Sequence, residues 1–343
     1  MSILFENELG YFLCSETYIN NMYEDINLKP KINPNLYKIF TPYCLKTKPK
    51  AKKNISLENN CDSEEEIEFI KKNYYQFNKE LKETNCVVSK LVQSKNTAAL
   101  NTADFVYEES GKYLISDAVG SNIGPPVDKM INNSRFFFPR NSIFFVKNVE
   151  SISLYLEGKT FDLILLDPPW YNKYIRRKRK KSPHAYNMMA NEELKNIPLE
   201  NMLTDNGLIV VWCTNSPKHI TYLKDIVFKK WKVGYISTWY WVKVTKSGET
   251  VCDFSKPNGK QPFERIIIGS RNNCLPKEKK LIVSVPSAIH SHKPILHQIF
   301  KKIISKDPKC LEIFARNLLP HWTSYGNETL RFQHESLYCV ENK

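Results

Sequence analysis

The sequence has no cysteine pair at the spacing of a zinc ribbon and no apolar run long enough to cross a membrane. Its nine cysteines stand far apart and are odd in number, which argues against a disulfide framework as well. The opening residues carry Glu6 and Glu8 where a secretory signal needs an unbroken apolar core. These absences predict a reduced, intracellular protein of the cytosol or nucleus.

Acidic residues are fewer than basic ones. Fifty Lys and Arg against 36 Asp and Glu give a formal net charge of +14. Such an excess favours a polyanionic partner, either nucleic acid or an anionic membrane surface. With 343 residues, 42% of them apolar, the chain is long enough for one large domain and a smaller one.

The first 142 residues divide into three expected parts. Residues 1–45 lack a strong period and are expected to form an N-terminal extension. Residues 46–60 are basic and then polar, which is typical of a linker, read either as a solvated loop or as a nuclear-import signal. Residues 61–142 are expected to form a helical or mixed region.

The clearest element of that region is a helix that begins near Ser63 and Glu66, which match a capping box. Five apolar side chains follow at spacings of three and four: Ile67, Ile70, Tyr74, Phe77 and Leu81. One apolar stripe of this kind is expected to pack on the parent domain. A helical arm that binds a partner or a nucleic acid is the alternative.

Residues 143–343 are expected to form one α/β domain. Short β-branched runs are predicted as strands: 161–166, 207–213, 236–244, 264–270, 280–286 and 310–315. Between several of them lie amphipathic stretches, notably 217–231 and 294–306, that each open with a proline and are predicted as helices. Alternation of this kind predicts a Rossmann-like, mostly parallel sheet with helices on both faces. Its ligand site should lie beyond the carboxyl ends of the strands.

One such end carries the sequence Asp167, Pro168, Pro169 and Trp170, which are our catalytic candidates. The two prolines lack a backbone donor but keep their carbonyls, so this rigid corner presents acceptors. Acceptors suit the exocyclic amine of adenine, whose N–H bonds must be held while its lone pair attacks a methyl group. Trp170 offers a face on which a base could stack. A simple turn remains the alternative for the motif taken alone.

The D-P-P-W corner resembles the signature of the adenine methyltransferases that include the messenger-RNA adenosine methyltransferase. Further segments follow in the order of that family, among them GLIVVWCTN, WYWVKVTKSGE, KQPFERIIIG, LIVSVPSAIHSHKP and LEIFARNLLPHWTSYGNE. The most similar branch is that of methyltransferase-like protein 4. The resemblance implies a permuted fold, in which the acceptor motif comes first and the cofactor loops come last, and it implies S-adenosylmethionine as cofactor.

The resemblance also implies which residues hold that cofactor. They are Asn148, Val149, Asp167, His292, Lys293, Arg316, Asn317, Asn327 and Glu328. Two positions depart from the family: Asn148 stands where an acid is usual, and Glu328 stands where the messenger-RNA enzyme has an amide. His290 and His292 have no third ligand at a plausible spacing, so no metal site is predicted.

Substrate contacts are expected from three sets of residues. By resemblance, Trp170, Trp212 and Trp241 surround the target adenine, and Lys243 shares the strand face of Trp241. A basic run follows the corner and is expected to bind phosphates, although a solvated or nuclear-import segment is the ordinary reading. The run consists of Arg176, Arg177, Lys178, Arg179, Lys180 and Lys181. Tyr186 is a candidate for a loop that closes over substrate, with Asn172 and Tyr174 as weaker candidates.

Together these features predict a nuclear, monomeric enzyme that methylates the N6 amine of adenine. The branch resemblance implies internal 2′-O-methyladenosine of the U2 small nuclear RNA as substrate, with DNA adenine as the alternative. A non-catalytic RNA-binding partner of such an enzyme, or a nuclear scaffold built on the basic run, are the rival hypotheses. An unpaired base enters such a site more easily than a paired one, which favours single-stranded RNA.

Overall fold

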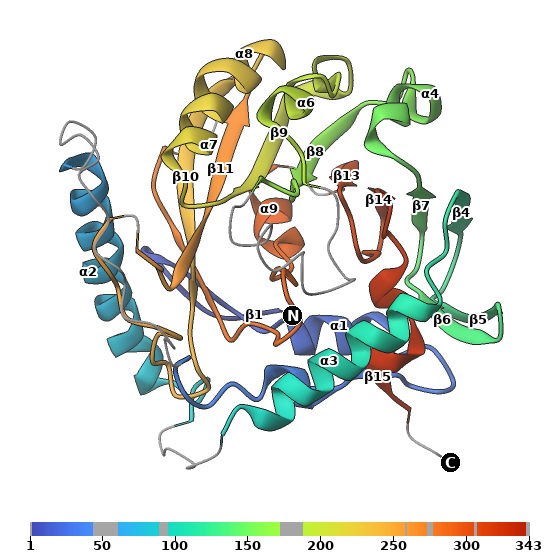
Figure 1. The fold of residues 1–343 in the computed structure, drawn as a ribbon, viewed down its shortest axis with the longest axis horizontal. Coiled ribbons are helices and arrows are strands. Elements are labelled where there is room, and N and C mark those ends of the chain that lie inside the picture. The colour runs from blue at the N-terminus through green and yellow to red at the C-terminus, as the bar shows by residue number, and fades with distance from the viewer. Residues whose placement is uncertain are drawn as a thin grey trace.

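A computed structural model describes residues 2–43, 61–88, 95–171, 188–257, 259–272, 277–304 and 307–340. Its centre is an eleven-stranded sheet with the order β1-β2-β12-β10-β11-β9-β8-β13-β14-β7-β4 (Figure 1). The strands of this sheet are β1 (Ile3–Asn7), β2 (Gly10–Leu13), β4 (Ala118–Asn122), β7 (Ser142–Val146), β8 (Phe161–Leu166), β9 (Leu203–Cys213), β10 (Gly234–Lys243), β11 (Phe263–Ser270), β12 (Leu281–Ser284), β13 (Cys310–Ile313) and β14 (Trp322–Tyr325).

The middle of the sheet is parallel. β7, β14, β13, β8 and β9 run in one direction, and β12 is parallel to both of its neighbours, β10 and β2. Antiparallel pairing is confined to β11, which lies between β9 and β10, and to the edge strands β1 and β4. All six predicted strands are present, and the predicted mostly parallel α/β fold is confirmed.

Helices cover both faces because successive side chains of a strand point to opposite sides. Ile164 and Leu166 of β8 pack in one core cluster with α4 (Ile152–Leu156), α6 (Asn191–Lys195), α7 (Pro217–Tyr222) and α8 (Phe228–Lys230). Leu163 and Leu165 pack in another with α1 (Ser15–Met22) and α9 (His297–Ile303). The predicted helix 217–231 is present, with a π turn over 223–227, whereas α9 begins three residues after the expected start at 294.

The predicted apolar helix is α2 (Cys61–Glu83), which lies at the left of Figure 1 and shares a core cluster with β10 and β12. All five side chains of its predicted stripe are buried against those strands, so packing on the parent domain is confirmed. The capping box is wrong, however, because the helix begins at Cys61 and Ser63 already lies inside it. Glu66 instead turns its carboxylate toward Arg265 of β11, which is buried and needs a counter-charge.

The sheet begins earlier in the sequence than expected. Residues 3–13, assigned to an N-terminal extension, add β1 and β2 at one edge through parallel pairing of β2 with β12, and residues 118–122 add β4 at the other edge. These strands are only four or five residues long, so they show too little periodicity to be recognised alone. The predicted linker 46–60 lies outside the described residues, and the division into domains stays a prediction.

Further elements outside the large sheet include two small sheets, a helix and a 3-10 turn. Two small sheets pair β3 (Lys31–Ile32) with β15 (Tyr338–Cys339) and β5 (Val127–Ile131) with β6 (Ser134–Phe138). The helix α3 (Thr97–Lys112) and the short 3-10 turn η1 (Pro34–Tyr37) contact each other. Within the described ranges, no helix is long and apolar enough to cross a membrane.

Candidate active site

The D-P-P-W corner leaves the sheet between β13 and β9. Asp167 follows the last residue of β8, and its backbone N–H lies 3.4 Å from the Ile313 carbonyl at the end of β13. The chain then turns sharply, because the Trp170 N–H donates to the Pro168 carbonyl at 2.8 Å and the Met189 N–H donates to the Pro169 carbonyl at 2.8 Å. Each carbonyl has two lone pairs, so Pro168 keeps one acceptor site for a ligand.

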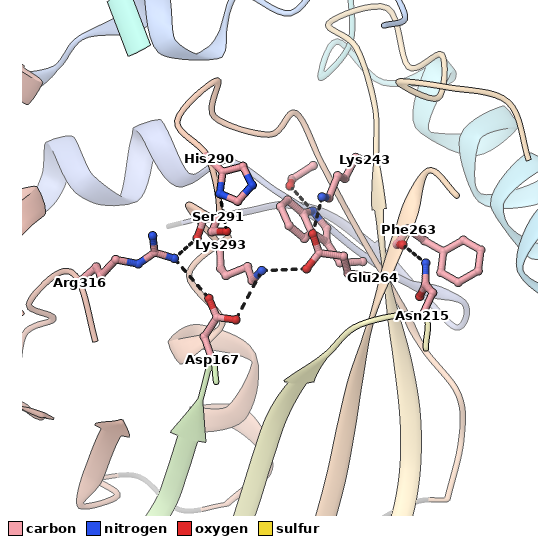
Figure 2. A network of polar contacts seen from close by, with 11 residues as sticks. Asp167, Asn215, Lys243, Phe263, Glu264, His290, Ser291, Lys293 and Arg316 are labelled. Carbon is pink, nitrogen blue, oxygen red and sulfur yellow. Dashed lines mark hydrogen bonds and ion pairs between the residues drawn. The ribbon is translucent and has the colours of Figure 1, made fainter. Parts of the chain in front are cut away.

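A chain of alternating charges crosses the edge of the sheet at this corner (Figure 2). Lys293 lies between two acids, with its Nζ 2.8 Å from Glu264 Oε2 and 3.5 Å from Asp167 Oδ1. Lys243 pairs with the other oxygen of Glu264, at 2.5 Å. Arg316 approaches the second oxygen of Asp167 at 3.6 Å and donates to the Ser291 carbonyl at 3.0 Å.

Neighbouring charges and burial shift the pKa values of the residues in this row of ion pairs. Burial opposes ionisation of Glu264, but Lys243 and Lys293 outweigh it and hold the pKa of Glu264 well below its usual range. Burial raises the pKa of Asp167, although Lys293 and Arg316 act against that rise. The pKa of Lys293 is raised, since Asp167 and Glu264 outweigh the opposing effect of burial. Lys293 is therefore a fixed positive charge beside the corner.

A hollow opens beside Lys293 at the ends of β8 and β13. Its polar lining comes from Asp167, Ser291, His292, Lys293, Glu312, Arg316 and Asn317. Two buried atoms in this lining, Glu312 Oε2 and His292 Nδ1, have no hydrogen-bond partner within the described part of the chain. Burial and the nearby Asp167 raise the pKa of Glu312 to about 8, while burial and Arg316 lower that of His292 to about 4. Unpaired polar atoms of this kind are costly unless a ligand pairs with them.

The expected contacts for a nucleoside cofactor follow one another along the sheet edge. Strand order places Asp167, Arg316, Asn327 and Asn148 after β8, β13, β14 and β7 respectively. Three strand spacings of about 4.8 Å give roughly 14 Å, a length that suits an extended nucleoside with an amino-acid tail.

The predicted cofactor residues after β7 and β14 make contacts within their own turns. Asn148 is exposed, and its side chain caps the turn that starts at Val149 and contacts Glu150 instead of facing the hollow. Val149 is buried in the core. Asn327 is exposed, and Glu328 pairs with Arg331. The predicted cofactor contacts at Asn148 and Val149 stay predictions.

Two of the three predicted tryptophans lie together. The rings of Trp212 and Trp241 meet edge to face with their centroids 5.5 Å apart, and Lys293 and Lys243 lie over them. The Trp170 ring belongs to the core cluster on the other face of the sheet and is 7% exposed. Its indole N–H donates to the Trp212 carbonyl at 2.8 Å, which holds the ring beneath the corner. In this arrangement Trp170 anchors the turn, and base stacking on its ring stays a prediction.

The predicted phosphate-binding segment lies outside the described residues. It is the basic run Arg176 to Lys181, and the substrate-loop candidates Asn172, Tyr174 and Tyr186 lie outside the described residues as well. At the start of this segment, His219 lies 4.9 Å from the Trp170 ring, and its ring nitrogens face the Tyr171 carbonyl and the Asn191 side chain. Among the described residues, no group of three His, Cys, Asp or Glu side chains could hold a metal ion.

Sequence reasoning missed Glu264, Glu312 and His219. Glu312 carried a signal, because it is a lone acid inside the apolar strand β13 and so had to face either solvent or a site. Glu264 stands at the start of β11, opposite Trp241, and only the antiparallel pairing brings it to the carboxyl edge of the neighbouring strands. His219 gave no signal beyond its place in a helix.

The fold defines a Rossmann-like, mostly parallel α/β protein with a charged hollow at the carboxyl ends of β8 and β13. The sequence model of the MT-A70 protein family matches residues 161–328 of this chain. The chain belongs to this family.

Its similarity to curated proteins extends beyond the matched region. It is 35% identical over 272 residues to the human N(6)-adenine-specific methyltransferase METTL4, covering 74% of this chain and 56% of that protein. It is 37% identical over 214 residues to the N6-methyladenosine RNA methyltransferase MTA1 of Cryphonectria parasitica, covering 60% and 63%. It is 27% identical over 364 residues to a Caenorhabditis elegans DNA N6-methyl methyltransferase, covering 95% and 96%. The chain thus spans about half the length of the human relative.

Proposed function

We propose that this protein transfers a methyl group from S-adenosylmethionine to the exocyclic N6 amine of adenine in nucleic acid. The observation that carries the proposal is the corner at Asp167, where an acceptor-rich turn meets Lys293, Arg316 and the unpaired Glu312. Family membership and the names of the relatives support the same reaction.

The hollow fits the amino-acid part of this cofactor by charge. Lys293 and Arg316 suit its carboxylate, Asp167 suits its ammonium group, and the unpaired oxygen of Glu312 can accept a hydrogen bond from that ammonium. Asn317 lies in the same lining and can bond to a ribose hydroxyl. When bound, the cofactor supplies a methyl group on a positively charged sulfur.

The chain's own residues would then orient the acceptor. Asp167 and the free lone pair of the Pro168 carbonyl can accept the two N–H bonds of an adenine amine. Holding both bonds directs the nitrogen lone pair outward, so catalysis arises from alignment and from acceptors that are fixed in advance. Glu264 keeps Lys293 and Lys243 in place from below.

For the substrate we propose single-stranded nucleic acid, with internal 2′-O-methyladenosine of the U2 small nuclear RNA as the first candidate and adenine in DNA as the second. The printed names of the relatives include both RNA and DNA methyltransferases. The net charge of +14 suits either polymer. We further propose a monomer that acts in the nucleus.

The rival hypothesis is a non-catalytic nucleic-acid-binding partner. It would not require Asp167, Lys293, Arg316 and Glu312 to converge on one hollow, and their convergence favours the enzyme.

The test is product formation. The full chain is incubated with isotopically labelled S-adenosylmethionine and single-stranded RNA or DNA, and digested nucleosides are analysed by mass spectrometry for N6-methyladenine. We expect Asp167→Asn to lower the rate about 100- to 1000-fold, as loss of one fixed electrostatic contact does, with an unchanged circular dichroism spectrum. Undiminished turnover in that variant, or no product with the unaltered protein, would refute the proposal.

A further inference from the structure

His219 contacts the D-P-P-W corner but does not line the hollow that we assign to the cofactor. It is the third residue of α7, the helix that follows β9. The centroid of its ring lies 4.9 Å from that of Trp170, and its Nε2 atom lies 3.2 Å from the Tyr171 carbonyl oxygen. His219 therefore contacts the two residues that continue the chain directly after Pro168 and Pro169.

The other ring nitrogen of His219 contacts the chain where it returns to the corner. Nδ1 lies 2.7 Å from the side-chain oxygen of Asn191, the first residue of α6. Met189, two residues earlier, forms a bridge with Trp170 and donates its N–H to the Pro169 carbonyl at 2.8 Å. The imidazole thus joins the outgoing and the returning segments of the corner.

Histidine suits this place because its two ring nitrogens can serve different partners. A backbone carbonyl only accepts, so Nε2 carries the proton that His219 donates to Tyr171. Burial lowers the pKa of His219, although the Tyr171 carbonyl acts against that shift, so the ring is neutral near pH 7 and Nδ1 is an acceptor. The Asn191 side chain is an amide, which can turn its N–H toward an unprotonated Nδ1. One neutral ring then makes both bonds.

The Trp170 ring is held by one stretch of chain, from the end of β9 to α7. Its indole N–H donates to the Trp212 carbonyl at 2.8 Å, and the His219 ring packs against it from α7. Pro217 opens α7 and restricts its backbone, so a short and stiff connection joins these two supports. A rotation of Trp170 would turn the Pro168 carbonyl, since the Trp170 N–H donates to that carbonyl.

We propose that His219 is a positioning residue for methyl transfer, and that it fixes the direction of the Pro168 carbonyl through the residues that follow the corner. This inference rests on the proposed function, in which Asp167 and that carbonyl accept the N–H bonds of the adenine amine. An amine held by misdirected acceptors points its lone pair away from the methyl group, so the loss falls on the chemical step. Binding of S-adenosylmethionine in the hollow beside Lys293 does not depend on this support.

The test compares His219→Ala with the control Lys218→Ala, an exposed neighbour on the same helix. Methyl transfer is measured in a single turnover with the single-stranded RNA or DNA that yields product with the unaltered protein. We expect the rate of His219→Ala to fall about 10-fold, the scale of one or two net hydrogen bonds. The Kd values for S-adenosylmethionine and for the oligonucleotide should not change. A wild-type rate in His219→Ala, or an equal loss in the control, overturns the inference.

A conservative variant separates the hydrogen bond from the packing of the ring. The amide nitrogen of glutamine can take the place of Nε2 in histidine, so His219→Gln can still donate to the Tyr171 carbonyl. We expect this variant to recover the rate to within about 3-fold of the wild type, because most of the loss comes from that bond. A rate as low as that of His219→Ala would show that the bond does not position the corner and would overturn the inference.

Hydrogen exchange gives a readout that requires no activity. The N–H groups of Trp170 and Met189 donate to the Pro168 and Pro169 carbonyls, so their exchange reports opening of the corner. We expect His219→Ala to speed exchange in peptides that contain these two residues and to leave peptides of α9 unchanged. Unchanged exchange at the corner overturns the inference.

The two proposals can fail separately. If the unaltered protein forms no N6-methyladenine, the proposed function fails, and hydrogen exchange still tests whether His219 holds the corner. If the unaltered protein is active and His219→Ala matches its rate, only the present inference fails.

Discussion

Two adjacent charged residues of β11, the buried Arg265 and the half-buried Glu264, lie on opposite faces of the sheet, and their surroundings differ. Arg265 faces α2, where Glu66 accepts from it through both carboxylate oxygens and Asn215 accepts at 2.5 Å. Glu264 faces the edge of the sheet, where it pairs with Lys243 and Lys293. Successive side chains of a strand alternate in direction, so one strand serves both networks.

The difference between the two networks lies in what they leave unpaired. Around Arg265, Tyr240 completes the set by donating to Glu66 at 2.7 Å, and none of these four residues has an unpaired buried atom in the described structure. Beyond Lys293, the side chains of Glu312 and His292 each retain one. A closed network stabilises the fold, whereas an open network is a place where a ligand can complete the bonding.

The largest expected effect breaks the closed network. Glu66→Gln leaves the buried Arg265 guanidinium without its counter-charge, and loss of one partner of a buried ion pair costs about 3–5 kcal/mol. We expect the free energy of unfolding in urea to fall by that amount. The control Glu68→Gln, on an exposed face of the same helix, should change it by less than about 0.5 kcal/mol. Equal stability of the two variants would contradict the contrast between the networks.

The second prediction removes Lys293 from the open network at the ends of β8 and β13. Lys293→Met removes the positive charge that we assign to the cofactor carboxylate, and a hydrogen bond to a charged group contributes about 1.5–3 kcal/mol. The Kd for S-adenosylmethionine, measured by calorimetry, should rise roughly 10- to 150-fold. The control Lys301→Met on the exposed side of α9 should leave it unchanged. A wild-type Kd for Lys293→Met would place the carboxylate elsewhere.

The smallest effect concerns pH. The pKa of Glu312 is raised to about 8 by burial and by Asp167, so the folded chain keeps this proton while the unfolded chain loses it above about pH 4.3. The wild type therefore loses stability, relative to Glu312→Gln, as pH rises from 5 to 8. We expect Glu312→Gln to gain in Tm over the wild type across that interval, without ligand. A gap in Tm that does not change with pH would show that Glu312 is ionised in the fold.

Local pattern was sufficient for most of the fold. The long strands of the sheet have apolar runs on both faces, and the stripe of α2 follows the helical period, so both could be predicted. The N-terminal strands could not, because β1 and β2 are short, and this pair joins the sheet only through β2 and β12, more than 260 residues apart. The capping box at Ser63 was not found, because α2 already includes Cys61 and Glu66 pairs with the distant Arg265.

Site residues that belong to a local sequence motif could be predicted. Site residues that reach the site only through the pairing of distant strands could not. Asp167, Lys293 and Arg316 were candidates from the sequence, and the structure brings them together. Glu264 reaches them only through the antiparallel register of β11. Trp170 looked like a stacking ring, yet the bond from its indole to the Trp212 carbonyl turns it into the core. Such a contact between distant segments leaves no trace in local sequence.

The most direct test of the central claim, that the open network at the ends of β8 and β13 is the cofactor site, is a crystal structure with S-adenosylhomocysteine. We predict that the amino-acid end of this ligand contacts Lys293 and Arg316 on one side and Asp167 and Glu312 on the other. Electron density for the ligand away from these four residues would contradict the account.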